Sequence, residues 1–133
     1  MRTARHVLLF KSEDHELVGV TAFNGEDVAL GRRRIAGWRL ELVALDPRYW
    51  GRSIDADIDG CPATMKASEY LLRSTFRRML EIDARRVIVV ARVHDDNAES
   101  IAMCARVGLD RTERESDDYW GMLGEVNPVA GPA

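Results

Sequence analysis

The sequence predicts one α/β domain, an α+β arrangement of about six strands and two main helices. Its 133 residues are enough for a single hydrophobic core. Six stretches with strand character precede, separate or follow two stretches in which apolar residues recur at helical spacing. No repeat or low-complexity linker divides the chain. We therefore expect one domain over residues 1–126 and a flexible tail over residues 127–133, whose prolines and glycine oppose both helix and strand.

The first third of the chain has the pattern of three strands. Residues 6–10 and 17–23 are rich in β-branched and aromatic side chains, and a polar segment separates them. This arrangement predicts an antiparallel hairpin. A third strand is expected over residues 38–45, ending at Asp46-Pro47 because proline cannot donate to a strand ladder. The polar stretch over residues 48–64 is expected to be a loop.

Two helices are predicted in the second half. Apolar residues recur at helical spacing over residues 71–82, which predicts an amphipathic helix packed on a sheet. Residues 87–93 form a nearly continuous β-branched run, typical of a strand covered on both faces. The next helix is expected to begin after Asp96 as N-cap, with Glu99 three residues on, and to end at Gly108.

The last elements are expected to be a closing pair of strands over residues 109–115 and 118–126. The predicted order is thus hairpin, strand, loop, helix, strand, helix and strand pair. A dinucleotide-binding fold opens instead with a strand, a G-x-G-x-x-G turn and a helix. That motif is absent from the sequence.

Composition excludes several classes of protein. No run approaches the roughly 18 apolar residues of a membrane span, and residues 1–10 lack the pattern of a signal peptide, so we expect a cytoplasmic protein without membrane contact. Cys61 and Cys104 are too few for a disulfide framework, and no Cys/His pair has zinc-ligand spacing. A net charge of −3 argues against nucleic acid as a partner, and the arginines over residues 32–34 are interpreted as a solvated turn.

Two segments have the character of a binding site for a phosphate-bearing ligand. Gly51 lets backbone N–H groups approach a ligand, and the N-terminus of the following helix adds partial positive charge. Arg48 and Arg52 supply side chains for charge-assisted bonds to phosphate oxygens. Asn97, after the strand over residues 87–93, has a carboxamide that both donates and accepts. It suits a ligand with amide groups.

Taken in order, three motifs resemble the GNAT family of N-acetyltransferases. They are Leu-Val-Gly-Val over residues 17–20, Leu-Val-Ala-Leu-Asp-Pro-x-Tyr-x-Gly-Arg over residues 42–52, and Asn-Ala-Glu-Ser-Ile over residues 97–101 with the following Gly108-Leu109. The similarity covers residues 6–123. It implies a GNAT-like mixed, mostly antiparallel sheet and acetyl-CoA as co-substrate.

The resemblance also assigns residues to the cofactor. In the family, the strand before the Pro-x-Tyr loop splays from its neighbour, and the pantetheine arm lies in the gap. Val43, Ala44 and Leu45 would contact pantetheine. Gly51, Arg52 and Ser53, with Arg48, would lie at the diphosphate. Asn97 and Ser100 would face the cofactor near its thiol.

The sequence departs from the family at its phosphate loop and at its N-terminus. Trp50 stands where the Q/R-x-x-G-x-G/A motif has Gln or Arg, although a register beginning at Arg48 fits better. Residues 56–66 are extra, so Gly60 or the N–H groups near Ala67 are alternatives for phosphate binding. The family's N-terminal strand and two helices are mostly missing. Either the acceptor site is open or a second subunit completes it, and we expect a homodimer.

Two residues are candidates for the general base. Glu41 lies on the strand that leads to the cofactor loop, where a carboxylate can deprotonate an ammonium directly or through water. The alternative is an ion pair with Arg39 or a neighbouring strand. His94 follows a buried strand and suits base chemistry near neutral pH. Its alternative is a loop histidine bonded to Asp95.

Two residues are candidates for the general acid. Cys104 falls where family members frequently have a catalytic tyrosine, and its alternative is a small buried apolar residue. Tyr119 becomes a second candidate if it faces the cleft, and the alternative for Tyr119 and Trp120 is core packing.

The sequence therefore predicts an acetyl-CoA-dependent N-acetyltransferase that acts on an amine of a small molecule or protein by direct transfer in a ternary complex. A covalent cysteine intermediate is disfavoured because Cys104 has no His/Asp partner at recognisable spacing. One alternative is a non-catalytic GNAT-like acyl-CoA-binding sensor or interaction module. Another is an unrelated α/β ligand-binding domain.

Overall fold

The computed structural model describes residues 4–129, and its elements follow the predicted order with one addition. The elements are β1 (His6–Lys11), β2 (Leu17–Leu30), β3 (Arg33–Leu45), the short 3-10 helix η1 (Pro47–Tyr49), β4 (Ser53–Ile58), β5 (Cys61–Lys66), α1 (Ala67–Ile82), β6 (Ile88–His94), α2 (Ala98–Arg106), β7 (Asp110–Ser116) and β8 (Tyr119–Glu125).

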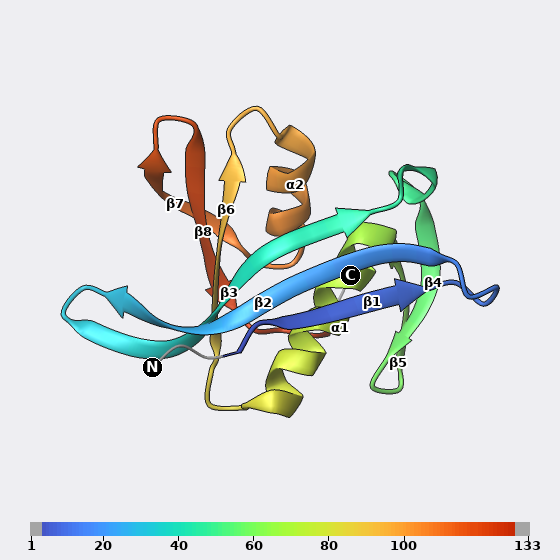
Figure 1. Cartoon of the computed structure of the whole chain (residues 1–133), viewed down its shortest axis with the longest axis horizontal. Helices are drawn as coiled ribbons and strands as arrows, with labels where there is room; N and C mark the ends of the chain where they lie inside the picture. Colours follow the sequence, from blue (N-terminus) through green and yellow to red (C-terminus); the bar gives the residue numbers. More distant parts are fainter. Residues whose placement is uncertain (1–3, 130–133) are drawn as a thin grey trace.

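Six strands form one sheet in the order β1-β2-β3-β6-β8-β7 (Figure 1). Only β3 and β6 run parallel, and every other neighbouring pair in this sheet is antiparallel. The predicted mixed, mostly antiparallel sheet with two main helices is therefore confirmed. No helix among residues 4–129 has the length and apolarity needed to cross a lipid bilayer.

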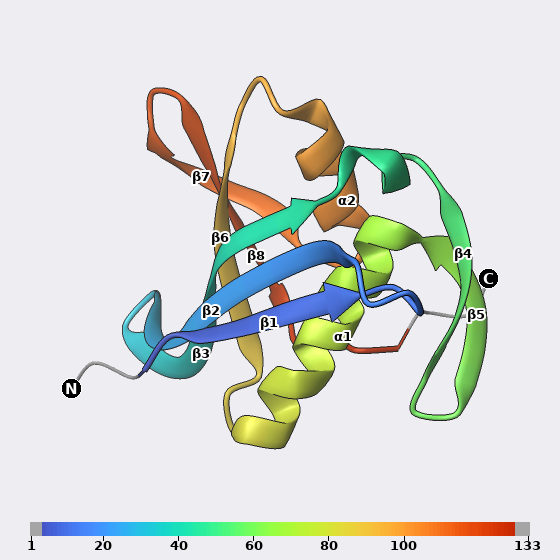
Figure 2. The same cartoon turned by 45° about the vertical axis from the view of Figure 1, so that its right-hand side comes forward.

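Helix α1 packs against one face of this sheet, where it crosses β1, β2 and β3 (Figure 2). Its apolar side chains Leu72, Phe76 and Met79 are fully buried and belong to the main core. The hydroxyls of Thr75 in α1 and Thr21 in β2 form a buried hydrogen bond of 2.8 Å. Burial of both hydroxyls is tolerated because each has a partner.

Strands β3 and β6 pair over only three residues and then separate (Figure 1). The last pair is Arg39–Val90, after which β3 continues to Leu45 and β6 to His94. Glu41 lies at the point of departure, because β2 pairs with Leu40 and Leu42 through consecutive residues and skips it. An extra residue of this kind is a β-bulge, which bends its strand. The bulge thus accompanies the opening of a gap in the middle of the sheet.

The stretch expected to be a loop over residues 48–64 contains a hairpin instead. Strands β4 and β5 form a separate two-stranded sheet. Asp59 and Gly60 join them, both with positive φ, as a two-residue turn between twisted strands requires. The sequence signal was present, because Ile54, Ala56 and Ile58 alternate with aspartates before the Asp-Gly pair.

Several predicted boundaries were wrong by a few residues. Strand β2 continues to Leu30 and strand β3 begins at Arg33, both beyond the limits expected from the sequence, and a tight turn joins them. Helix α1 begins at Ala67, directly after the extra residues 56–66, and its apolar pattern follows from Leu71. The N-cap of α2 is Asn97 rather than Asp96, since the Asn97 side chain accepts a hydrogen bond from the Ser100 N–H at 3.0 Å.

The predicted flexible tail over residues 127–133 is only partly described. Asn127 and Val129 both accept hydrogen bonds from the buried Arg73 guanidinium through their carbonyl oxygens, at 3.0 and 3.1 Å. Residues 130–133 lie outside the described part of the chain. Up to Val129, therefore, the chain is attached to α1.

Candidate active site

The gap between β3 and β6 exposes backbone groups of β3. Asp46 N–H donates to the Val18 carbonyl at 2.8 Å, so this residue faces β2. In an antiparallel pair of strands, hydrogen-bonded and non-hydrogen-bonded positions alternate. The backbone N–H and C=O of Ala44 therefore point to β2 as well, and those of Val43 and Leu45 point toward β6. Because pairing with β6 ends at Arg39, these turned groups have no strand partner in the described chain.

One of these groups is taken by a side chain from the following loop. The indole Nε1 of Trp50 donates to the Leu45 carbonyl at 2.8 Å. The Trp50 side chain is otherwise largely in solvent, with 67% of the residue exposed. The backbone N–H and C=O of Val43 and the N–H of Leu45 remain directed into the gap. This pattern of donors and acceptors matches what an amide-bearing chain needs.

The loop after β3 contains the predicted glycine in an open position. Gly51 has φ of 72°, and a Cβ added there would meet nothing within 4 Å. Its backbone is therefore accessible. Arg48 is instead engaged away from the loop, at 3.0 Å from Asp46 and 3.2 Å from Glu16. Its hydrogen bond to Asp46 raises the pKa of Arg48 and lowers that of the carboxyl.

The other residues predicted to bind phosphate lie partly in the loop after β3 and partly in the β4–β5 hairpin. The Arg52 guanidinium lies over the Tyr49 ring, 5.5 Å from the ring centroid. The backbone carbonyl of Arg52 accepts a hydrogen bond of 2.9 Å from the Ala67 N–H. This bond brings the loop directly to the start of α1, so the β4–β5 hairpin leaves and returns at the same place. Ser53 is the first residue of β4, and Gly60 is at the hairpin's far turn.

Two basic side chains that sequence reasoning missed lie at the N-terminus of α1. Lys66 is its N-cap without a side-chain capping bond, and the Lys66 ammonium donates to the Gly51 carbonyl at 3.1 Å. Arg106, from the end of α2, reaches the Ser68 hydroxyl at 3.4 Å. The spatial proximity of α2 to Ser68 carries no sequence signal, whereas Lys66 directly precedes the apolar helical pattern.

Asn97 and Ser100 lie at the start of α2, directly after β6 and close to the far end of the gap. The Asn97 Oδ1 atom is used by the Ser100 N–H, as described above. The carboxamide nitrogen of Asn97 is thus the part of this side chain that remains to donate to another group.

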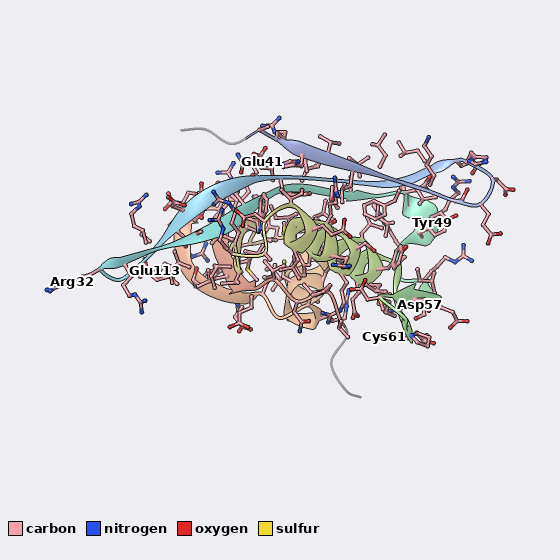
Figure 3. The ribbon with its side chains drawn as sticks, turned by 90° about the horizontal axis from the view of Figure 1, so that it is seen from below. Arg32, Glu41, Tyr49, Asp57, Cys61 and Glu113 are labelled. Carbon is pink, nitrogen blue, oxygen red and sulfur yellow. The ribbon has the colours of Figure 1, made fainter. Side chains whose placement is uncertain are left out.

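A cavity of about 660 Å³ lies on the sheet where β3 and β6 separate. Glu41 from β3, Arg92 from β6 and Tyr119 from β8 are among its lining residues. Buried Val89 and Ala91 of β6 face the helices, so Arg92, which alternates with them, faces the other way. Figure 3 shows α1 beneath the sheet and Glu41 on the far side of it. The cavity therefore opens on the face opposite α1.

The two candidate bases have different neighbours. The Glu41 carboxylate lies 2.7 Å from the guanidinium of Arg5, so it forms an ion pair, as the alternative interpretation had it, but with a residue that precedes β1 and not with Arg39. The His94 Nδ1 atom accepts the Asp96 N–H at 3.2 Å and lies 3.7 Å from the Asp95 carboxylate. His94 does not line the cavity. Glu41 does, and is therefore the better placed of the two.

The Tyr119 ring contacts both Arg92 and His94. It lies under the Arg92 guanidinium, 4.7 Å from the ring centroid. The His94 ring meets it edge-on, with centroids 5.1 Å apart. Tyr119 therefore faces the cavity and is held there on two sides. Trp120, on the other face of β8, packs against the core and lies beneath Arg111 and Arg114.

Solved structures with a similar arrangement of strands and helices include several acetyltransferases. The chain matches a chain of the KacTA–DNA complex (14% identity, TM-score 0.65), covering 92% of this chain and 68% of that one. It matches a putative GNAT-family acetyltransferase from Desulfovibrio desulfuricans (15% identity, TM-score 0.63), covering 92% and 69%. It also matches the Vibrio cholerae spermidine N-acetyltransferase in complex with CoA and spermine (11% identity, TM-score 0.64), covering 92% and 66%.

The chain has the GNAT fold. No protein-family model matches the sequence, and no curated protein matches it either. The likeness therefore lies in the arrangement of the elements. It extends over about two-thirds of the length of those three solved chains.

Within this GNAT fold, Cys104 has the environment of a core residue. Only 2% of it is exposed, and it belongs to the main hydrophobic cluster. Burial raises the pKa of its thiol to about 11. This placement fits the alternative interpretation of Cys104 as a small apolar residue, and leaves Tyr119 as the acid candidate that lines the cavity.

Proposed function

We propose that this protein is an N-acetyltransferase that uses acetyl-CoA as co-substrate and transfers the acetyl group directly to an amine in a ternary complex. The observation that carries the proposal is the opening of β3 from β6 after Arg39–Val90, with unpaired backbone groups inside the gap. A cavity lined by Glu41 and Tyr119 lies over the same opening. The acetyl donor in the gap and the amine acceptor in the cavity can thus approach the same point from two sides.

The residues of the gap fit acetyl-CoA. Val43 and Leu45 offer backbone groups to the pantetheine amides, while Ala44, which lies between them, pairs with β2. The open backbone at Gly51, with Arg52, Lys66 and Ser53 around the loop, would hold the diphosphate. Arg48 would have to leave its two carboxylates to take part. Its role is therefore secondary.

Further along the gap, the start of α2 offers polar groups for the other end of the pantetheine arm. The free carboxamide nitrogen of Asn97 and the Ser100 hydroxyl would be available there. At the N-terminus of α1, which no side chain caps, Arg106 together with the partial positive charge of the first turn suits phosphate oxygens.

Glu41 and Tyr119 supply the proton transfers in this proposal. Acetyl-CoA supplies the acetyl group and leaves as the thiol. The Glu41 carboxylate accepts a proton from the incoming ammonium, directly or through water, so that the nitrogen lone pair is free to form the new N–C bond. The Tyr119 hydroxyl would donate a proton to the departing CoA sulfur as the C–S bond breaks, and the second proton that the nitrogen loses on forming the amide restores this hydroxyl. His94 supports the Tyr119 ring rather than touching the acceptor.

Calorimetry and a thiol-release assay test this function. Acetyl-CoA and CoA are titrated into the protein, and thiol release is then followed over a panel of small amines and peptide N-termini. The proposal predicts saturable binding and amine-dependent thiol release. Binding without release for any amine would favour the alternative of an acyl-CoA sensor. Absence of binding at millimolar cofactor would remove both.

We also propose that the protein forms a homodimer. Val7 and Leu9 of the edge strand β1 are 55% and 60% exposed, and Leu42 of β3 is 48% exposed. Val7 and Leu42 lie in one cross-strand row through Ala22, so the exposed apolar side chains are neighbours. Covering such a patch is favourable. Light scattering at micromolar concentration should give twice the mass of one chain, and a monomer would contradict this proposal.

A further inference from the structure

The six-stranded sheet has two edges, and only one of them is protected against pairing with a further strand. Strand β7 forms the protected edge. All of its residues are exposed, most of them are charged, and its register with β8 breaks on either side of Arg114. Charged side chains and bulges keep an edge strand from accepting another strand.

Strand β1 forms the other edge and lacks this protection (Figures 1 and 2). It contains no proline and no acidic residue, and Lys11, its last residue, is its only lysine or arginine. No strand within residues 4–129 pairs with its outer side. A row of unpaired backbone groups beside apolar side chains is a template for another strand.

The hydrogen-bonding pattern of the sheet shows which groups of β1 face outward. Ala44 of β3 is bonded to its partner in β2, whose N–H and C=O therefore point away from β1. Those of Thr21, the next residue of β2, point to β1, where they meet Leu8. The alternation along β1 then turns the N–H and C=O of Val7 and Leu9 away from β2.

The side chains of β1 are self-complementary. When two copies of β1 pair antiparallel about Leu8, Val7 of each copy lies opposite Leu9 of the other. His6 of each copy then lies opposite Phe10 of the other. Val7 and Leu9 are also the residues whose N–H and C=O face outward, so their two pairs are the hydrogen-bonded ones. A two-fold interface needs one patch that fits itself, and this strand meets that condition.

The ends of the strand limit the pairing to this segment. A β-bulge follows Phe10 and bends the strand before Lys11. Arg5 would lie opposite Lys11 of the other copy, but its guanidinium is already 2.7 Å from the Glu41 carboxylate. The like charges at the two ends therefore weaken the pairing little.

We propose that β1 pairs with β1 of a second copy of this chain, antiparallel and centred on Leu8, so that the two six-stranded sheets join into one. The inference rests on the homodimer proposed above and names its interface, and it does not depend on the chemistry of the candidate site. The exposed side chains of Val7 and Leu9 from both copies become neighbours across the junction.

Amide hydrogen exchange measured by NMR tests this pairing, because it reports on single backbone N–H groups. In the dimer, the Val7 and Leu9 amides should exchange as slowly as those of Leu8 and Phe10, since all four are then hydrogen-bonded. In a monomer, the Val7 and Leu9 amides should exchange at least about 100-fold faster than the other two.

A double variant, Val7→Lys with Leu9→Lys, supplies the monomer. It places lysines opposite each other at both hydrogen-bonded pairs, so the dissociation constant of the dimer should rise about ten-fold or more. Slow exchange of the Leu8 and Phe10 amides in this variant shows that β1 still pairs with β2, which distinguishes loss of the dimer from a failure to fold.

Leu42→Lys is the matched control. It adds the same charge on the same face of the sheet, two strands away from the edge, and should leave the dimer intact. A dimer that is lost in Leu42→Lys but kept in the double variant would mean that the copies pack face to face, and would overturn the pairing.

The remaining outcomes separate this pairing from the homodimer itself. Fast exchange of the Val7 and Leu9 amides in a dimer would overturn the pairing and leave the homodimer in place. A monomer by light scattering at micromolar concentration would contradict both proposals. Because none of these measurements uses acetyl-CoA, the proposed acetyltransferase activity is tested separately.

Discussion

The Trp50 indole donates a hydrogen bond of 2.8 Å to the Leu45 carbonyl, and this contact lies at the mouth of the gap between β3 and β6. The carbonyl belongs to the set of β3 backbone groups that are turned away from β2. A side chain of the loop thus competes for one of the groups that a ligand in the gap would use. The exposed position of Trp50 makes it free to move aside.

Replacement of Trp50 by Phe removes the competing N–H and keeps an aromatic side chain. The dissociation constant for CoA should fall about five-fold, since one hydrogen bond of about 1 kcal/mol no longer has to be broken. Calorimetry measures this change. In the unmodified protein, the fluorescence of Trp50 should change on binding. Weaker CoA binding by the Phe variant would mean that the indole contacts the ligand instead of competing with it.

Two substitutions test the two catalytic candidates that line the cavity. Glu41→Gln and Tyr119→Phe should each lower kcat/KM about 100-fold, the lower range for a general base or acid, and leave CoA affinity unchanged. Steady-state kinetics across pH measures both. If Glu41→Gln keeps full turnover at every pH, the base is another group, and His94→Gln is the next variant to measure.

The basic side chains at the start of α1 should act on the cofactor alone. Lys66→Met and Arg106→Met should each weaken CoA binding about ten-fold, because each removes a cation from the diphosphate position. The effect should diminish at high salt. Arg78→Met, an exposed variant elsewhere on α1, serves as control. Equal affinities for all three variants would remove Lys66 and Arg106 from the phosphate site.

Burial of Cys104 gives a pH dependence of stability. Because burial raises the pKa of its thiol from 9.0 to about 11, the unfolded chain loses this proton at lower pH than the folded one. Folding therefore retains a proton between these values, and the free energy of unfolding should fall as pH rises from about 9 to 11. Urea unfolding should show a shallower fall in Cys104→Ala. Parallel curves for the two proteins would contradict a buried, protonated thiol.

Arg73 should be important for stability rather than catalysis. It is 4% exposed, pairs with Glu69 at 2.9 Å and donates to the Arg106 carbonyl and to the C-terminal segment. Arg73→Met leaves the Glu69 carboxylate, whose side chain is only 13% exposed, without its cation, and about 3 kcal/mol of unfolding free energy should be lost. Arg85→Met, at an exposed position, should change it by less than about 0.5 kcal/mol.

The fold was predictable because local patterns agreed with the tertiary arrangement. The alternation in β1, the apolar stripe of α1 and the continuous run of β6 each specify an element, and the order of the motifs specified the sheet. The hairpin formed by β4 and β5 was missed, although its Asp59-Gly60 turn carried the signal, because the acidic residues of this segment were interpreted as a loop.

The candidate site was less predictable, because its geometry depends on residues far apart in the sequence. The alternation that turns Val43 and Leu45 toward the gap follows from strand pairing, which the motif implied. The ion pair of Glu41 with Arg5 and the meeting of Arg106 with Ser68 depend on tertiary packing. No local pattern specifies either contact.

Amide hydrogen exchange, measured by NMR with and without CoA, tests the central claim most directly. Without CoA, the Val43 and Leu45 amides should exchange fast and the Ala44 amide slowly, since only Ala44 is bonded to β2. On addition of CoA, the Val43 and Leu45 amides should become protected and Ala44 should change little. Protection elsewhere with no change at Val43 and Leu45 would contradict cofactor binding between β3 and β6.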